Sequence, residues 1–162
     1  MYTNSNSSQG SGNVDQSAPS QDGRGASPSP AVTVLVVEDD ALTRKAVGRA
    51  LQQAGYEVVL VGSAADALIV AQRVRFQVLV LDLHLADPDP FNGIHEGFGI
   101  LDWVRRQVGG YPFRVIVHTS QGAQHLMRKA EAYGVFAFCI KRRDMSGLIR
   151  CVGEAVQSLK MP

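Results

Sequence analysis

Five polar side chains in this sequence lie where runs of mostly apolar residues end. They are two acids after the first run (Glu38 and Asp39), an acid after the third (Asp82), a hydroxyl after the fourth (Thr119) and an amine after the fifth (Lys141). Clustered carboxylates repel unless a cation neutralises them, and such oxygen ligands suit Mg²⁺, which also bridges to phosphate. A lysine adds positive charge and a threonine adds a hydrogen-bond donor. Together they would form a pocket for a phosphoryl group, with Asp82 as the nucleophile that becomes an aspartyl phosphate.

The apolar runs before these residues are typical of strands, and segments of helical periodicity separate them. The strands are expected at residues 32–37, 57–61, 78–81, 113–118 and 135–140, and the helices at 41–54, 63–73, 96–107, 123–133 and 145–159. The third run is apolar at every position, as in a central strand buried on both faces. Five successive strand–helix units predict an α/β fold, a doubly wound parallel sheet with helices on both faces.

This topology determines where the polar side chains should lie. Right-handed crossovers place the carboxyl ends of all the parallel strands at one edge of the sheet. Ligands of open α/β sheets bind outside that edge. The five polar side chains are therefore expected to converge there, although they are far apart in the sequence.

Sequence signals also mark the ends of the first two helices. The first helix should stop at Gly55, because glycine commonly follows a last helical turn. Ser63 should cap the second helix, with Asp66 completing the capping arrangement. The apolar face expected to be buried in the first helix comprises Leu42, Ala46, Val47, Ala50, Leu51 and Ala54.

Composition bounds the class of protein. A chain of 162 residues suffices for one domain of ordinary size, and its net charge of +1 gives no strong field toward nucleic acid or membranes. No apolar run approaches the roughly 18–20 residues of a membrane span, and no signal peptide is recognisable. Cys139 and Cys151 could pair in principle, but they lie in an apolar strand and a helix, which favours buried free thiols. These features predict a soluble cytoplasmic protein.

Residues 1–30 differ in composition from the rest of the chain. Ser, Asn, Gln, Gly and Pro dominate this stretch, and very few of its residues are large and apolar. Such a stretch cannot bury enough surface to offset its ordering entropy. We expect a disordered tail at 1–30 and one folded domain at 31–162.

Four short motifs at predicted strand ends resemble those of the receiver domain of two-component response regulators. They are residues 36–39 (Val-Val-Glu-Asp), 79–83 (Leu-Val-Leu-Asp-Leu), 117–120 (Val-His-Thr-Ser) and 138–141 (Phe-Cys-Ile-Lys). The resemblance covers about residues 32–159. It implies a flavodoxin-like sheet of five strands in the order 2-1-3-4-5.

The resemblance also implies a role for each matching acid. Asp82 would accept a phosphoryl group from a phosphohistidine on a sensor histidine kinase or phosphotransfer protein. Asp39 would bind Mg²⁺ directly and Glu38 through water. Asp82 and the backbone carbonyl of His84 would complete the protein ligands of the ion.

The other matching residues would respond to the phosphoryl group. Thr119 and Lys141 would bind its oxygens and pull on the loops that carry them. The rotamer of Phe138 would follow activation, and Ser120 is a small residue that leaves the acceptor accessible. Phosphorylation would thereby shift the population between two conformers.

Two departures from the family pattern stand out. Arg142 and Arg143 follow the lysine, where the family usually has proline, and they are expected to form a solvated face or to contact a partner. The segment after Asp82, residues 86–95, is about seven residues longer than usual, and long loops are often functional. A lid, a partner-specific surface and a tolerated insertion are all compatible with it, and a second metal site is imaginable at Asp87, Asp89, His95 and Glu96.

Two histidines lie near the expected site. His84, two residues after the acceptor, could flank the path of a hydrolytic water or be a plain exposed loop residue. His118 precedes Thr119 inside an apolar strand, and we interpret it as a packed core residue rather than a proton shuttle.

The predicted function is that of a single-domain response regulator. No output domain follows the last predicted helix, so the expected output is contact with a downstream protein or onward phosphotransfer, without direct DNA binding or membrane attachment. The surface of the fourth helix, fifth strand and fifth helix would meet partners or form a homodimer. The protein would not be an enzyme beyond catalysing phosphorylation and dephosphorylation of its own Asp82.

Three other classes of function fit these residues less well. A pseudo-receiver would bind partners without phosphorylation; the long segment and the missing proline favour it, and the complete set of polar residues opposes it. An aspartyl-phosphate phosphatase would have a second acid two residues after the nucleophile, where His84 stands. A nucleotide-binding domain is disfavoured because no glycine-rich phosphate loop follows the first strand.

Overall fold

Strands and helices alternate along the whole of the folded chain. The computed structural model describes residues 31–85, 96–108, 110–120, 122 and 124–161. The strands are β1 (Thr33–Val37), β2 (Glu57–Val61), β3 (Val78–Leu81), β4 (Arg114–Thr119) and β5 (Ala137–Ile140), and the helices are α1 (Ala41–Gln53), α2 (Ala64–Arg73), α3 (Glu96–Gln107), α4 (Gln124–Ala132) and α5 (Ser146–Lys160). No helix in these ranges is long and apolar enough to cross a membrane. The tail at 1–30 and the segment 86–95 lie outside the described residues.

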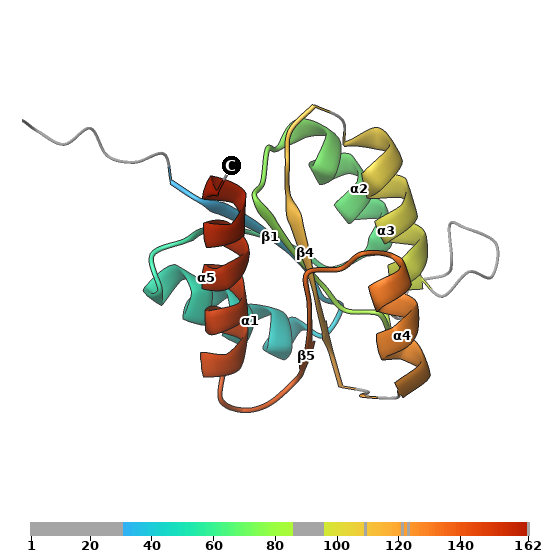
Figure 1. Ribbon diagram of the computed structural model, residues 1–162. Coiled ribbons are helices and arrows are strands. Elements are labelled where there is room, and N and C mark those ends of the chain that lie inside the picture. Colours follow the sequence, from blue (N-terminus) through green and yellow to red (C-terminus); the bar gives the residue numbers. More distant parts are fainter. Residues whose placement is uncertain (1–30, 86–95, 109, 121, 123, 162) are drawn as a thin grey trace, which may run out of the picture.

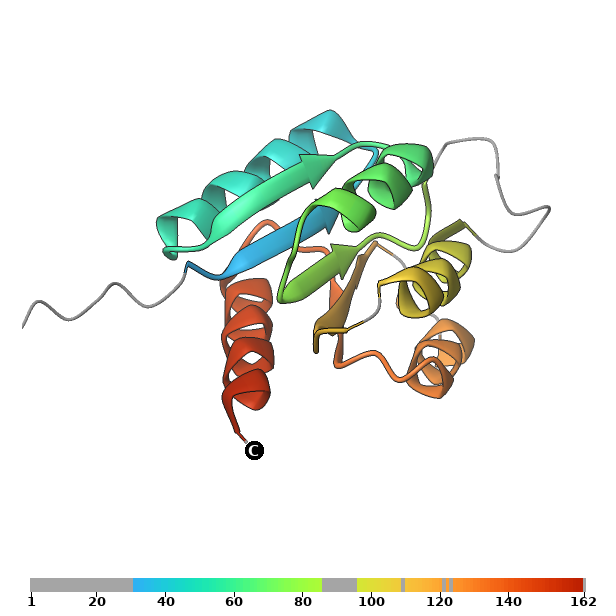
Figure 2. The ribbon, with the colours of Figure 1, turned by 90° about the horizontal axis from the view of Figure 1, so that it is seen from above.

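The strands form one parallel sheet in the order β2-β1-β3-β4-β5, which confirms the expected doubly wound architecture. Helices α1 and α5 cover one face of the sheet, and α2, α3 and α4 cover the other (Figures 1 and 2). Strand β3 lies at the centre of the sheet, and all four of its residues are buried. The continuous apolar run at 78–81 is explained by this double coverage.

Alternate residues of the central strands serve two separate cores. Leu35 and Leu79 point toward the layer of α2, α3 and α4, whereas Val34 and Val78 point toward α1 and α5. This alternation follows from the two-residue period of a strand. Because both faces are apolar, the strands are fixed in the sheet and their carboxyl ends are held in register.

The observed bounds differ from the predicted ones by one or two residues. The largest shift is at β5, which begins at Ala137 instead of residue 135. The backbone NH of Val135 donates to the carbonyl of Ala130 in α4 at 3.2 Å, and Phe136 is the first residue to bond to β4, at Val115. Val135 therefore closes the preceding helix instead of opening the strand.

The predicted buried face of α1 is wrong at three of its positions. Val47 and Leu51 are fully buried, but Leu42 is 79% exposed. Ala46 and Ala54 are also exposed. The helix meets the sheet only along a narrow middle stripe, where Gly48 allows Leu60 of β2 to approach: a Cβ at this glycine would lie 2.8 Å from a Leu60 methyl carbon.

The predicted helix signals are confirmed. Gly55 follows α1 with φ of 90°, a conformation in which a side chain would be strained. The hydroxyl of Ser63 accepts from the backbone NH of Asp66 at 3.0 Å, which caps α2. One cap was missed: the carboxylate of Asp40 accepts from the backbone NH of Thr43 at 2.7 Å and starts α1 directly after the acidic pair.

Candidate functional site

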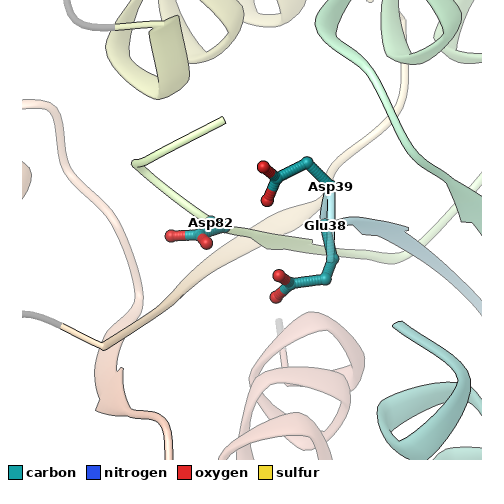
Figure 3. Close-up of side chains that lie close together, drawn as sticks. All are labelled: Glu38, Asp39 and Asp82. Atoms are coloured by element: carbon teal, nitrogen blue, oxygen red, sulfur yellow. The ribbon is translucent and has the colours of Figure 1, made fainter. Parts of the chain in front are cut away.

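The strand register brings the three predicted acids together. Val37 of β1 pairs with Leu81 of β3, so Glu38 and Asp82 are the next residues of neighbouring strands. The backbone NH of Asp82 donates to the carbonyl of Val37 at 3.0 Å, which holds the acid at the strand end. Carboxylate oxygens of Glu38, Asp39 and Asp82 all lie within 4.8 Å of one another (Figure 3).

Lys141 joins two of these acids. Its ammonium nitrogen lies 2.5 Å from Oδ2 of Asp82 and 2.7 Å from Oε2 of Glu38. The backbone NH of Lys141 donates to the carbonyl of Thr119 at 2.8 Å, which fixes the end of β5 beside the end of β4. The lysine therefore connects the acidic cluster to the strand that carries the hydroxyl.

The charges in this cluster shift one another's pKa values. Burial, partly offset by Lys141, raises the pKa of Glu38 above its usual range. Burial opposes the charge of Lys141, but hydrogen bonds and attraction from Asp82 and Glu38 outweigh it and raise the pKa of the lysine. Lys141 is therefore a fixed positive charge at neutral pH, facing a carboxyl group that is costly to keep ionised.

Thr119 and His84 meet on the other side of the acceptor. Thr119 is completely buried at the end of β4. Its hydroxyl oxygen lies 3.1 Å from Nδ1 of His84, and the backbone NH of His84 donates to Oδ1 of Asp82 at 3.1 Å. His84 is exposed, as expected for a plain loop residue. Its contacts with Asp82 and Thr119 nevertheless place it beside both the acceptor and the hydroxyl.

Arg44 is a residue of this site that the sequence reading missed. From α1, its Nη1 atom donates to the backbone carbonyls of Glu38 at 2.7 Å and of Asp39 at 2.9 Å. It also packs over Gly62, where an added Cβ would lie 3.0 Å from the guanidinium nitrogen. The only signal in the sequence was a basic residue one turn into the helix after an acidic pair, which is too common to be specific.

The donor set of the acidic cluster fits a divalent cation. Glu38 and Asp82 are only 2% and 4% exposed, so their charges are poorly screened by solvent. The adjacent side chains of Glu38 and Asp39 extend in opposite directions (Figure 3). Lys141 contacts the cluster at Glu38 and Asp82. Three carboxylates this close repel strongly, and an oxygen-ligated ion such as Mg²⁺ beside Asp39 and Asp82 would relieve that repulsion.

The remaining predicted residues differ in their burial. Phe138 is half-buried in β5 and packs against the core beneath α2, α3 and α4. Ser120 is exposed, as are Arg142 and Arg143 after the lysine. The second metal site imagined at Asp87, Asp89, His95 and Glu96 lies outside the described residues, which exclude 86–95 and the side chain of Glu96.

His118 is buried, as expected of a packed core residue, with 3% of its surface exposed. Burial and the nearby charge of Lys141 lower its pKa from 6.5 to about 4, against an opposing effect of Asp82.

The prediction for the cysteines needs a correction. Cys139 and Cys151 are free, but they are half-buried rather than buried, because both line a cavity between β5 and α5.

A comparison with known protein families identifies the family of this domain. Residues 34–152 match the model of the response regulator receiver domain. The chain belongs to the response regulator receiver domain family. It is therefore a signalling module of two-component systems, of the kind that accepts a phosphoryl group on an aspartate and binds Mg²⁺ at an acidic pocket.

Curated relatives of this receiver domain are longer proteins. The transcriptional regulatory protein GlrR of Escherichia coli is 28% identical over 124 residues, which is 76% of this chain and 26% of that protein. The sensor histidine kinase AruS of Pseudomonas aeruginosa is 29% identical over 131 residues, 80% of this chain and 12% of that protein. The chain thus spans about a quarter or less of the length of these relatives.

Solved receiver domains have the same fold. A CheY-like receiver domain protein from Methanospirillum hungatei superposes with a TM-score of 0.70 at 20% identity, covering 80% of this chain and 97% of that one. The receiver domain of a LuxO repressor protein from Vibrio parahaemolyticus has a TM-score of 0.69 at 25% identity, with 80% and 93% coverage.

Proposed function

We propose that this receiver domain accepts a phosphoryl group on Asp82 from the phosphohistidine of a sensor histidine kinase or phosphotransfer protein. The observation that carries the proposal is the contact of 2.5 Å between Lys141 Nζ and Asp82 Oδ2 within a group of three acids. A carboxylate in contact with a fixed cation, at the carboxyl edge of the sheet, is placed to become an acyl phosphate.

In the transfer, a carboxylate oxygen of Asp82 attacks phosphorus as the bond from phosphorus to the donor imidazole nitrogen breaks. Lys141 would then exchange its contact with Asp82 for one with an oxygen of the phosphoryl group. The buried hydroxyl of Thr119 would donate to another oxygen. Positioning and charge neutralisation account for most of the rate acceleration in such a reaction, because the transition state is loose.

The acids of the cluster would also hold the metal ion. Asp39, Asp82 and the backbone carbonyl of His84 are the proposed direct ligands, and Glu38 the ligand through water. When bound, Mg²⁺ would supply neutralisation of the charge on the transferring oxygens. Arg44 supports this role of the loop, since it holds the backbone of both Glu38 and Asp39.

Phosphorylation would be read out by contact with another protein or by onward phosphotransfer. We propose the surface of α4, β5 and α5 for this contact, or for a homodimer, because Met127 of α4 and Ile140 of β5 are exposed apolar residues there. Thr119 and Phe138 would carry the change to this surface. A single-domain organisation, a cytoplasmic location and the absence of direct DNA binding remain predictions from the sequence.

The test is a phosphoryl-transfer assay on the full chain. Acetyl phosphate or beryllofluoride is added with and without Mg²⁺, and the intact mass or the NMR spectrum is recorded. We expect a Mg²⁺-dependent adduct that is lost in Asp82→Asn and kept in Asp102→Asn. Asp102 is a matched control because it is an acid on α3 whose side chain is 45% exposed.

A protein that gives no adduct and no response to Mg²⁺ would contradict the proposal. It would then belong to the alternative class, a pseudo-receiver that binds partners without phosphorylation. An adduct that persists in Asp82→Asn would show a working transfer reaction at another residue.

A further inference from the structure

The two cysteines of the chain face each other between β5 and α5. The sulfur of Cys139 in the strand lies 3.1 Å from the sulfur of Cys151 in the helix. A disulfide bond has a sulfur–sulfur length of about 2.05 Å, so a movement of about 1 Å would join the pair. The two residues come from neighbouring elements of one chain, which makes an intramolecular bond the accessible product.

A small molecule can reach this pair from solvent. Both cysteines line a cavity of about 290 Å³ that also includes Ser146 and Gly147 at the start of α5. The cavity is bordered by Arg142 and Arg150 as well as by Asp144, so it is polar as well as open. Arg150 has Glu154 as an ion-pair partner at 3.7 Å on the exposed side of the helix. A pair of packed core cysteines would have no such opening.

We propose that Cys139 and Cys151 are a reversible redox pair that forms a disulfide by exchange with a low-molecular-weight disulfide such as oxidised glutathione. Cells keep thiols reduced in most compartments, so the bond would form under oxidising stress and be reversed by reduced thiols. The inference does not rest on phosphorylation of Asp82, which lies in a different site.

The exchange takes place in two balanced steps. The thiolate of Cys151 attacks one sulfur of the small disulfide, forms a mixed disulfide and releases one small thiolate, which takes up the proton. Cys139 then gives its proton to water and attacks the sulfur of Cys151, which releases the second small thiol. The protein loses two protons and two electrons, and the small disulfide takes them up and is reduced to two thiols.

The order of the two cysteines follows from their surroundings. Burial, together with the hydrogen bond and the charge of Cys151, raises the pKa of the Cys139 thiol well above its usual range. Since the thiolate is the attacking species, Cys139 is the poorer first nucleophile and serves as the resolving residue. The bond would tie β5, which precedes Lys141, to α5.

The experiment measures the redox equilibrium of the full chain. The reduced protein is incubated in mixtures of oxidised and reduced glutathione, quenched in acid, treated with an alkylating reagent and analysed by intact mass. We expect loss of two hydrogens with no alkylation, and a tryptic cross-link between the peptides 130–141 and 151–160. Reduction with dithiothreitol should restore two alkylated cysteines.

The unfolded chain is the control for the geometry of the fold, because two cysteines this near in sequence can pair without any folded structure. The same titration is repeated in urea above the unfolding transition. The native ratio of disulfide to dithiol should exceed the unfolded ratio by at least about tenfold, since the fold holds the sulfurs in place. In Cys139→Ser, Cys151 should accumulate as a stable mixed disulfide, and in Cys151→Ser, Cys139 should react more slowly.

Several results would overturn the proposal. These are a native ratio less than tenfold above that of the unfolded chain, glutathione on both cysteines without a cross-link, and disulfide-linked dimers in place of the intramolecular bond. Circular dichroism checks that each serine variant is folded, and Cys139→Ala and Cys151→Ala repeat the test if a serine variant is not.

Discussion

Nδ1 of the His84 imidazole lies 3.1 Å from the hydroxyl oxygen of Thr119, a residue on a different strand end. The backbone NH of the same histidine donates to the carboxylate of Asp82. One residue therefore holds both the proposed acceptor and the proposed phosphoryl-binding hydroxyl in the unphosphorylated protein. In the tautomer whose Nδ1 accepts the hydroxyl proton of Thr119, this contact has to break before Thr119 can donate that proton to a phosphoryl oxygen.

Replacing this histidine should favour the activated form. A hydrogen bond of this kind contributes about 0.5–1.5 kcal/mol, so we expect His84→Ala to bind beryllofluoride with Mg²⁺ roughly two- to tenfold more tightly. The measurement is a titration followed by NMR or calorimetry. His125→Ala, which removes an exposed histidine from α4, is the control and should bind as the wild type does. Unchanged or weaker binding by His84→Ala would contradict this reading of the contact.

Removing the lysine should cost both stability and function. Lys141→Met leaves Glu38 and Asp82 buried without their ion-pair partner, and breaking such a pair costs about 3 kcal/mol of unfolding free energy. Urea unfolding measures this loss, and Mg²⁺ should restore part of it by neutralising the acids. The acetyl phosphate adduct should be lost. Lys45→Met, at an exposed position on α1, should change neither the free energy of unfolding nor the adduct. A Lys141→Met variant as stable as the wild type would refute the prediction.

Arg44 should control how well the acidic loop binds metal. Arg44→Ala removes two charge-assisted hydrogen bonds to the backbone of the loop, which we expect to cost about 2 kcal/mol of unfolding free energy and to weaken Mg²⁺ binding. Calorimetric titration with Mg²⁺ measures the second effect. Arg44→Lys should recover part of both, since an ammonium group can replace one of the hydrogen bonds. Arg49→Ala on the same helix is exposed and serves as the control. Equal Mg²⁺ affinity in Arg44→Ala and the wild type would exclude a positioning role.

Burial of His118 should make stability depend on pH. Its pKa is about 4 in the folded protein against 6.5 for an ordinary histidine, so the unfolded chain binds a proton first as the pH falls. The contribution of His118 to the free energy of unfolding is fully present above pH 6.5. It is lost between pH 6.5 and about 4, and the loss amounts to at most about 3 kcal/mol. In urea unfolding across this range, without Mg²⁺, the free energy of unfolding of the wild type should fall more steeply with falling pH than that of His118→Leu. Parallel curves would contradict the assignment.

Much of the fold follows from local signals in the sequence. The apolar run before Asp82 required a strand covered on both faces, and the glycine at position 55 required a helix end. The errors come where an element meets its neighbours. Leu42 has the helical spacing of a buried residue but is exposed in the first turn of α1, and spacing alone does not reveal where a packing partner ends.

The sequence by itself determined which residues could form the site, because strand ends of a parallel sheet must share an edge. Glu38, Asp39, Asp82, Thr119 and Lys141 were identified in this way. Only the tertiary structure decided how they pair: that Lys141 spans Glu38 and Asp82, that Arg44 holds the acidic loop, and that Cys139 meets Cys151. These contacts depend on side-chain directions and on the depth at which a helix packs on the sheet, and neither quantity is encoded in the periodicity of one segment.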